Sequence, residues 1–90
     1  MLTKSIIIQV QNRQTSINHY IDGREARLLQ KNLWLNENEP SPAILKSEGD
    51  LIEILNPARK VNTFIYDNQL SKLLTSGPLS VTITFEVKES

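Results

Sequence analysis

The last segment of the chain alternates strictly between apolar and polar residues. From position 79 to 88, the odd positions are Leu79, Val81, Ile83, Phe85 and Val87, and every even position is polar. A two-residue period is typical of a β-strand that buries one face and exposes the other. The pattern therefore predicts a final strand over residues 79–88 and makes a sheet the organising element of the fold.

The same period recurs near the start of the chain. Residues 4–11 place Ile6, Ile8 and Val10 on one face, and the alternation resumes over residues 17–21 after a polar loop. These two segments predict the first two strands of the sheet.

The segment after the second strand has two interpretations. Asp22-Gly23 follows that strand directly and favours a type I′ hairpin turn, in which both central residues need positive φ. We therefore expect the chain to return as a strand over residues 24–36. A helix over residues 25–35 is the competing interpretation, because Ala, Arg, Leu, Gln and Lys are good helix formers.

The second half of the chain predicts a hairpin, one more strand and a short helix. The hairpin joins residues 43–46 to residues 51–55, and the further strand covers residues 61–66. Asp67 can cap a short helix that gathers three leucines on one side, and Gly77 marks its end.

The sum of these elements is five or six short strands with one helical turn in a single β-rich domain over residues 1–90. Evenly spaced short strands of this kind suggest a small barrel. We expect a mainly β fold, a small five-stranded OB-like, partly open barrel with one short helix. A two-layer α+β sandwich is the alternative.

Composition narrows the class of protein. The 90 residues include ten basic and ten acidic side chains, so no overall positive charge points to nucleic acid. The distribution is uneven: residues 1–31 have five basic and two acidic side chains, and residues 36–56 have one basic and five acidic. The chain has no cysteine and no apolar run of membrane-spanning length, which predicts a soluble, unprocessed cytoplasmic protein without a membrane partner.

The residues that perform catalysis are scarce. The chain has one histidine and no cysteine, and its three glycines form no phosphate-binding loop. His19 shares strand parity with Ile17 and Ile21, which favours a half-buried structural role. Glu37 and Glu39 fall in a predicted exposed loop, where burial would not raise a carboxyl pKa. We therefore expect no enzyme, no metal site and no cofactor.

Trp34 is the strongest candidate for binding. On a strand over residues 24–36, Leu29, Leu33 and Leu35 would face the core, and Trp34 would share the outer face with amides and an arginine. An exposed aromatic ring among such groups suits base stacking. Alternatively, Trp34 covers the other side of the sheet or lies in a dimer interface. Tyr20 has the polar parity of its strand and could join the same patch.

Several residues occur in an order found in one known family. Gly23 and Arg24 form a turn glycine with a basic residue, Leu28 and Trp34 follow as leucine and strand aromatic, and a proline, aliphatic residues and Lys46 come next. This order resembles the single-stranded-DNA-binding proteins of filamentous phages, which are small dimeric OB-fold proteins. The resemblance implies that Leu28 and Trp34 contact bases and that the basic residues contact phosphates.

Two functions follow as hypotheses. The first is a non-enzymatic binder of single-stranded DNA or RNA, acting as a homodimer in the cytoplasm, which would be the host cytoplasm for a phage protein. The second is a small β-rich interaction or assembly module without a nucleic-acid ligand, in which aromatic side chains and edge strands form a protein interface. The candidate nucleic-acid-binding residues are Arg24, Arg27, Leu28, Trp34, Lys46, Arg13 and Tyr20.

Overall fold

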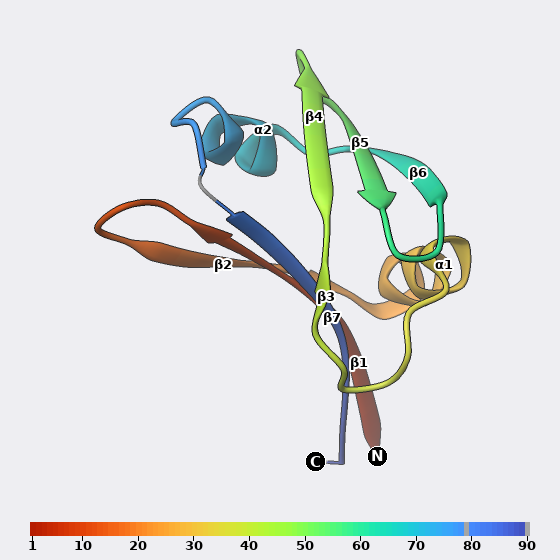
Figure 1. The fold of residues 1–90 in the computed structure, drawn as a ribbon. Coiled ribbons are helices and arrows are strands. Elements are labelled where there is room, and N and C mark those ends of the chain that lie inside the picture. The colour runs from red at the N-terminus through yellow and green to blue at the C-terminus, as the bar shows by residue number, and fades with distance from the viewer. Residues whose placement is uncertain (79, 90) are drawn as a thin grey trace.

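The computed structural model describes residues 1–78 and 80–89, which form seven β-strands and two α-helices (Figure 1). The strands are β1 (Leu2–Gln11), β2 (Ser16–Asp22), β3 (Ser41–Pro42), β4 (Ile44–Glu48), β5 (Leu51–Asn56), β6 (Val61–Tyr66) and β7 (Ser80–Glu89). The helices are α1 (Gly23–Leu33) and α2 (Asn68–Leu74). The strands pair in two antiparallel sheets, in the orders β2-β1-β7-β3 and β4-β5-β6. The prediction of a mainly β fold is confirmed.

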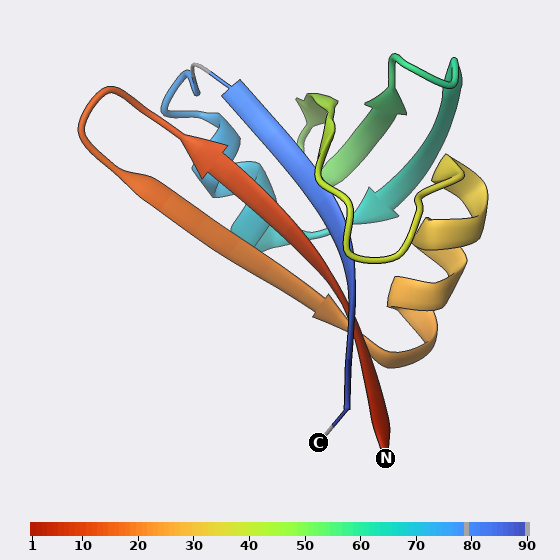
Figure 2. The same ribbon diagram turned by 60° about the horizontal axis from the view of Figure 1, so that its bottom comes forward.

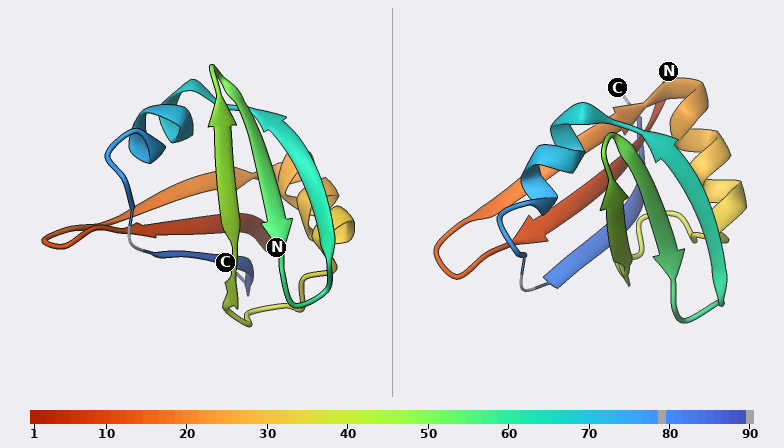
Figure 3. Two further views of the ribbon diagram at one scale, coloured as in Figure 1. Left: turned by 45° about the horizontal axis from the view of Figure 1, so that its top comes forward. Right: turned by 90° about the horizontal axis from the view of Figure 1, so that it is seen from above.

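The two sheets form separate layers, with the hydrophobic core between them (Figure 3). Helix α1 contacts β1 of one sheet and β6 of the other, and α2 packs against β4 and β5 on the opposite side of the molecule (Figure 2). The described strands therefore do not close into a barrel, because helices fill the sides between the layers. Seven strands and two helices replace the five strands and one helix that we expected. The largest fully buried side chains are Phe85, Ile6, Ile8, Leu33, Ile52, Ile54, Leu70, Ile83, Val10 and Asn56.

Several predicted elements are confirmed. Their sequences have either a clear two-residue alternation of apolar and polar positions or a clear helix cap. Strand β7 turns Ile83 and Phe85 into the core, whereas Leu79, the first residue of the predicted strand, lies outside the described residues. The hairpin in the middle of the chain is formed by β4 and β5. Helix α2 begins after Asp67, whose Oδ1 accepts a hydrogen bond from the Leu70 backbone N–H at 3.0 Å.

The prediction of a strand over residues 24–36 is wrong, because Gly23–Leu33 forms α1. Leu29 and Leu33 are four residues apart, a spacing that puts them on one face of either a strand or a helix. Ala26 separates the two cases, since it shares a helical face with Leu29 and is completely buried. The competing helix is therefore correct, beginning and ending two residues earlier than expected.

The junction between β2 and α1 also differs from the prediction. Asp22 ends β2 and Gly23 begins α1, with no residue between them. Asp22 has an extended backbone with φ −110°, and only Gly23 has positive φ, at 68°. A type I′ turn needs positive φ at both residues, so no hairpin forms here. The Asp22 carboxylate instead accepts a hydrogen bond from Ser5 Oγ on β1 at 2.7 Å.

Candidate functional site

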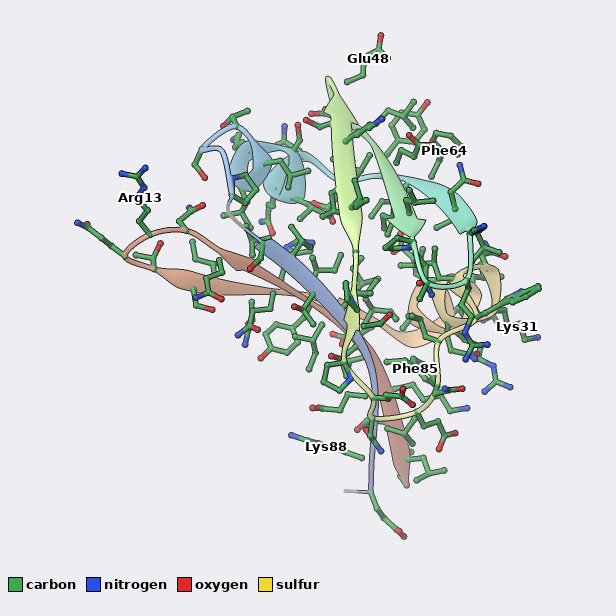
Figure 4. All side chains as sticks on the ribbon, viewed as in Figure 1. Arg13, Lys31, Glu48, Phe64, Phe85 and Lys88 are labelled. Carbon is green, nitrogen blue, oxygen red and sulfur yellow. The ribbon has the colours of Figure 1, made fainter. Side chains whose placement is uncertain are left out.

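The outer face of α1 carries a row of three exposed cations, Arg24, Arg27 and Lys31. Residues three or four apart lie on one side of a helix, so these three side chains are neighbours. The opposite side of α1 packs into the core and buries Ala26, Leu29 and Leu33. In Figure 4, Lys31 extends from the edge of the molecule away from both sheets. We call these residues the α1 cation row.

The α1 cation row has no ion-pair partner among the described residues. Within residues 1–78 and 80–89, the ion pairs join His19 to Asp67 and Lys88 to Glu86. Arg24 also lies in the first turn of α1, where the positive end of the helix dipole opposes a cation. These charges therefore contribute little to the stability of the fold and are available to an anionic solute.

Trp34 ends α1 in a backbone conformation that is unusual for a large side chain. Its φ and ψ are 54° and 47°, in the left-handed region that favours glycine. The conformation is fixed by two hydrogen bonds, from the Leu35 N–H to the Gln30 carbonyl at 3.1 Å and from the Trp34 N–H to the Lys31 carbonyl at 3.4 Å. A non-glycine residue in this region costs of order 1 kcal/mol. The helix end would form more easily with glycine, so the backbone gives no reason for an indole here.

The indole of Trp34 is mostly exposed to solvent. Its relative exposure is 58%, and that of Leu28, on the outer side of α1, is 59%. The prediction that Trp34 is exposed is confirmed, although it lies at a helix end and not on a strand. Two large apolar side chains therefore accompany the α1 cation row.

The turn between β5 and β6 adds cations near Trp34. Arg59 lines a hollow of about 90 Å³ together with Trp34 and Glu39. Lys60 is the next residue in the turn. The turn is held against the end of α1 by Asn56, whose Nδ2 donates a buried hydrogen bond to the Leu33 carbonyl at 2.7 Å. The end of α1 and the turn thus form one surface that has cations, an aromatic ring and one carboxylate.

The structure separates the other predicted site residues from this surface. Lys46 lies on the outer face of the three-stranded sheet, on β4, which β5 separates from β6. Arg13 lies in the β1–β2 loop at the far end of the molecule from Lys31 (Figure 4). Tyr20 lies on the outer face of the four-stranded sheet and is the register partner of Ile7 on the neighbouring strand β1. The prediction that Tyr20 joins Trp34 in one patch is wrong, because Tyr20 lies on β2 shortly before the start of α1, whereas Trp34 lies at the other end of that helix. Arg24, Arg27, Leu28 and Trp34 do lie together, along α1 and its end.

Sequence reasoning missed five residues near this surface. Lys31 follows Arg24 by seven residues, a spacing that indicates a shared face only once the segment is known to be a helix. No sequence signal places the Arg59–Lys60 turn beside α1. Phe64 and Tyr66 had a clear signal, because they alternate with Thr63 and Ile65 and so must lie on the solvent side of β6.

The one histidine of the chain makes a structural contact. His19 is half-buried, as predicted, and is bonded to the Asp67 carboxylate that caps α2. No group of three or more His, Cys, Asp or Glu side chains in the described ranges could hold a metal ion.

No family model matches this chain, and no curated protein or solved structure matches it significantly. Neither described helix is long and apolar enough to cross a membrane.

Proposed function

We propose that the protein is a non-enzymatic single-stranded nucleic-acid-binding protein and that the outer face of α1 is its binding surface. The α1 cation row neutralises phosphates, and Trp34 stacks on a base at the end of the helix. The observation that carries the proposal is an exposed indole, held in a strained backbone position, at the end of a helix whose outer face carries three cations without an ion-pair partner among the described residues.

The strength of such a surface comes from two effects. Stacking of a base on an aromatic side chain is worth about 1–3 kcal/mol. Each phosphate neutralised on a single strand adds about −0.7 to the slope of log K against log salt concentration. Three to five cations therefore give a slope of about −2 to −3.5, which corresponds to a roughly 15- to 130-fold loss of affinity between 50 and 200 mM salt.

The neutral net charge of the chain is compatible with this proposal because the charges are separated in space. Glu48 lies at the tip of the β4–β5 hairpin, on a different side of the molecule from Lys31 (Figure 4). Charges in solution are screened over about 10 Å at 0.1 M salt. A nucleic-acid strand lying on α1 is therefore screened from Glu48 and meets the α1 cation row together with two carboxylates, Glu25 of the same helix and Glu39 beside Trp34.

A relationship to the filamentous-phage family and to its OB-like barrel remains a hypothesis. The residues that carry the resemblance between positions 24 and 34 lie on a helix in this protein. The proposal therefore depends on the surface of α1 and not on the resemblance.

The first test uses the single tryptophan as the probe. Oligo(dT) is titrated into the protein at about 20 mM salt while Trp34 fluorescence is followed, and salt is then raised to about 0.5 M. We expect saturable quenching that salt reverses. Unchanged fluorescence, together with no complex in a gel-shift experiment at the same low salt, would contradict the proposal.

A protein-interaction module, assembling as a homodimer, is the second candidate function. It is supported by β2, which is the outer strand of its sheet among the described residues and carries the exposed Tyr20. Exposed strand edges offer unpaired N–H and C=O groups to a second chain. Sedimentation velocity of the wild type and of Tyr20→Glu distinguishes this candidate, which predicts a dimer that the substitution weakens.

A further inference from the structure

A second aromatic surface lies beside α1, in the hollow between this helix and β6. The hollow has a volume of about 260 Å³. Its walls bring together one apolar residue of the helix and two aromatic residues of the strand. These are Leu28, Phe64 and Tyr66.

The three side chains are exposed because Leu28 lies on the outer side of α1 and the two aromatic residues lie on the solvent side of β6. Phe64 is 58% exposed and Tyr66 is 79% exposed, while Ile65 between them points into the core. A polar residue at either position would face water equally well, so the core does not require these rings. In Figure 4, Phe64 points out from the three-stranded sheet, on the side of the molecule away from Arg13.

The charges around the hollow differ between its two sides. Leu28 lies four residues after Arg24 and three before Lys31, so it adjoins the α1 cation row directly. On the other side, Glu25 lines the hollow and Glu53 is the register partner of Phe64. The cations attract phosphates towards the outer side of α1. The side of Phe64 away from α1 is of mixed charge, because Lys46 is the register partner of Glu53 and lines a hollow with Glu53 and Phe64.

We infer that this hollow receives unpaired bases of a nucleic-acid strand whose phosphates lie along the α1 cation row. Phe64 and Tyr66 stack on the bases, and Leu28 packs between the bases and the backbone. The inference rests on the proposed function and extends it, because it assigns bases to a strand of the sheet as well as to Trp34.

The spacing of the two rings suits neighbouring bases. Residues two apart on one strand face are separated by about 6.6–6.8 Å. This distance is larger than the 3.4 Å rise of stacked bases in duplex DNA. The bound nucleic-acid strand is therefore held with its bases unstacked from one another, one base on each ring. A duplex cannot adopt this form. We expect fluorescein-labelled oligo(dC) or oligo(dT) to bind at least tenfold more tightly than a duplex of the same length.

The direct test removes each ring and measures affinity by fluorescence anisotropy with labelled oligo(dT) at low salt. Phe64→Ala and Tyr66→Ala are each expected to weaken binding by about tenfold or more. A tenfold loss lies in the lower part of the range expected when one base loses its aromatic stacking partner. Tyr20→Ala is the matched control, because Tyr20 is similarly exposed but lies on the other sheet. Circular dichroism and thermal melting verify that each variant is folded.

A second measurement moves the fluorescent probe into the hollow. In a Trp34→Phe background, Phe64→Trp provides a single indole on β6, and Tyr20→Trp provides the control indole on the other sheet. Oligo(dT) is expected to quench the first variant and leave the second unchanged.

The outcomes separate this inference from the function on which it rests. Failure of every oligonucleotide to bind the wild type contradicts both. Binding that is lost with Arg27→Ala but is unaffected by Phe64→Ala and Tyr66→Ala supports the α1 surface and overturns the inference. A change in sedimentation coefficient with Phe64→Ala, without a change in oligonucleotide affinity, would assign the hollow to contact between copies of the chain and also overturn it.

Discussion

The Nε2 atom of His19 lies 2.8 Å from the Oδ2 atom of Asp67, and this contact joins the two layers of the molecule. His19 belongs to β2 of the four-stranded sheet, and Asp67 links β6 to α2. The other carboxylate oxygen of Asp67 accepts the Leu70 N–H. One side chain therefore caps a helix and holds that helix against the opposite sheet.

The first prediction concerns acid stability. Partial burial alone would raise the pKa of Asp67, but the Leu70 N–H and the His19 side chain together hold this pKa below its ordinary value of 3.8. A lowered folded-state pKa stabilises the protein fully above the ordinary value, and this stabilisation is lost as pH falls through the lowered pKa. Urea unfolding at several pH values should show wild type more stable than Asp67→Asn near neutral pH. The difference should shrink below pH 3.8, and a difference that stays constant with pH would contradict the assignment.

The second prediction concerns the backbone at Trp34. We expect Trp34→Gly to be more stable than Trp34→Ala by about 1 kcal/mol, because only glycine adopts the left-handed region without a steric cost. Both variants should lose affinity for oligo(dT), since both lack the indole. Urea unfolding and anisotropy titration measure the two effects. Equal stability of the glycine and alanine variants would show that the backbone at this position relaxes after the indole is removed.

The third prediction concerns the hydrogen bond between Asn56 and Leu33. Asn56 is 2% exposed, and its Nδ2 donates to the last carbonyl of α1. Asn56→Ala leaves this carbonyl buried without its side-chain partner, which should cost about 1–3 kcal/mol of unfolding free energy. Asn62→Ala is the control, because Asn62 is exposed and its side chain donates an exposed hydrogen bond to the Glu53 carboxylate. A similar loss in both variants would contradict the special role of Asn56.

The fourth prediction separates the cations by their place in the fold. Lys31→Ala should reduce the slope of log K against log salt concentration for oligo(dT) by about 0.7, the value for one phosphate on a single strand. Arg13→Ala should leave the slope unchanged, because Arg13 lies at the far end of the molecule. Equal changes in the two variants would indicate a response to net charge and not to a defined surface.

The sequence was informative where one period or one cap determines an element. The alternation of β7 and the Asp67 cap of α2 each have a single structural interpretation, and both predictions are correct. The segment after Gly23 was ambiguous because Leu29 and Leu33 satisfy the strand and the helix period equally. Ala26 could have decided between them.

The candidate site was harder to predict because it combines elements that are distant in sequence. Arg59 lies in a turn that is held against α1 by the hydrogen bond between Asn56 and Leu33, two residues that are 23 positions apart in the sequence. No local sequence pattern encodes this contact. Phe64 and Tyr66 were predictable as exposed rings from strand parity. Their proximity to Leu28 depends on the packing of α1 against β6, which only the three-dimensional structure provides.

The direct passage from Asp22 into Gly23 has a consequence for how the chain tolerates changes in length. Because no loop separates β2 from α1, one residue inserted at this junction would rotate the helix by about 100° relative to the sheet. Ala26 and Leu29 would then leave the core, and the cations would turn towards it. An insertion in the loop at residues 12–15 changes neither the register of β2 nor the orientation of α1. We therefore expect related chains to vary in length at that loop and to keep the strand and the helix adjoining without an added residue.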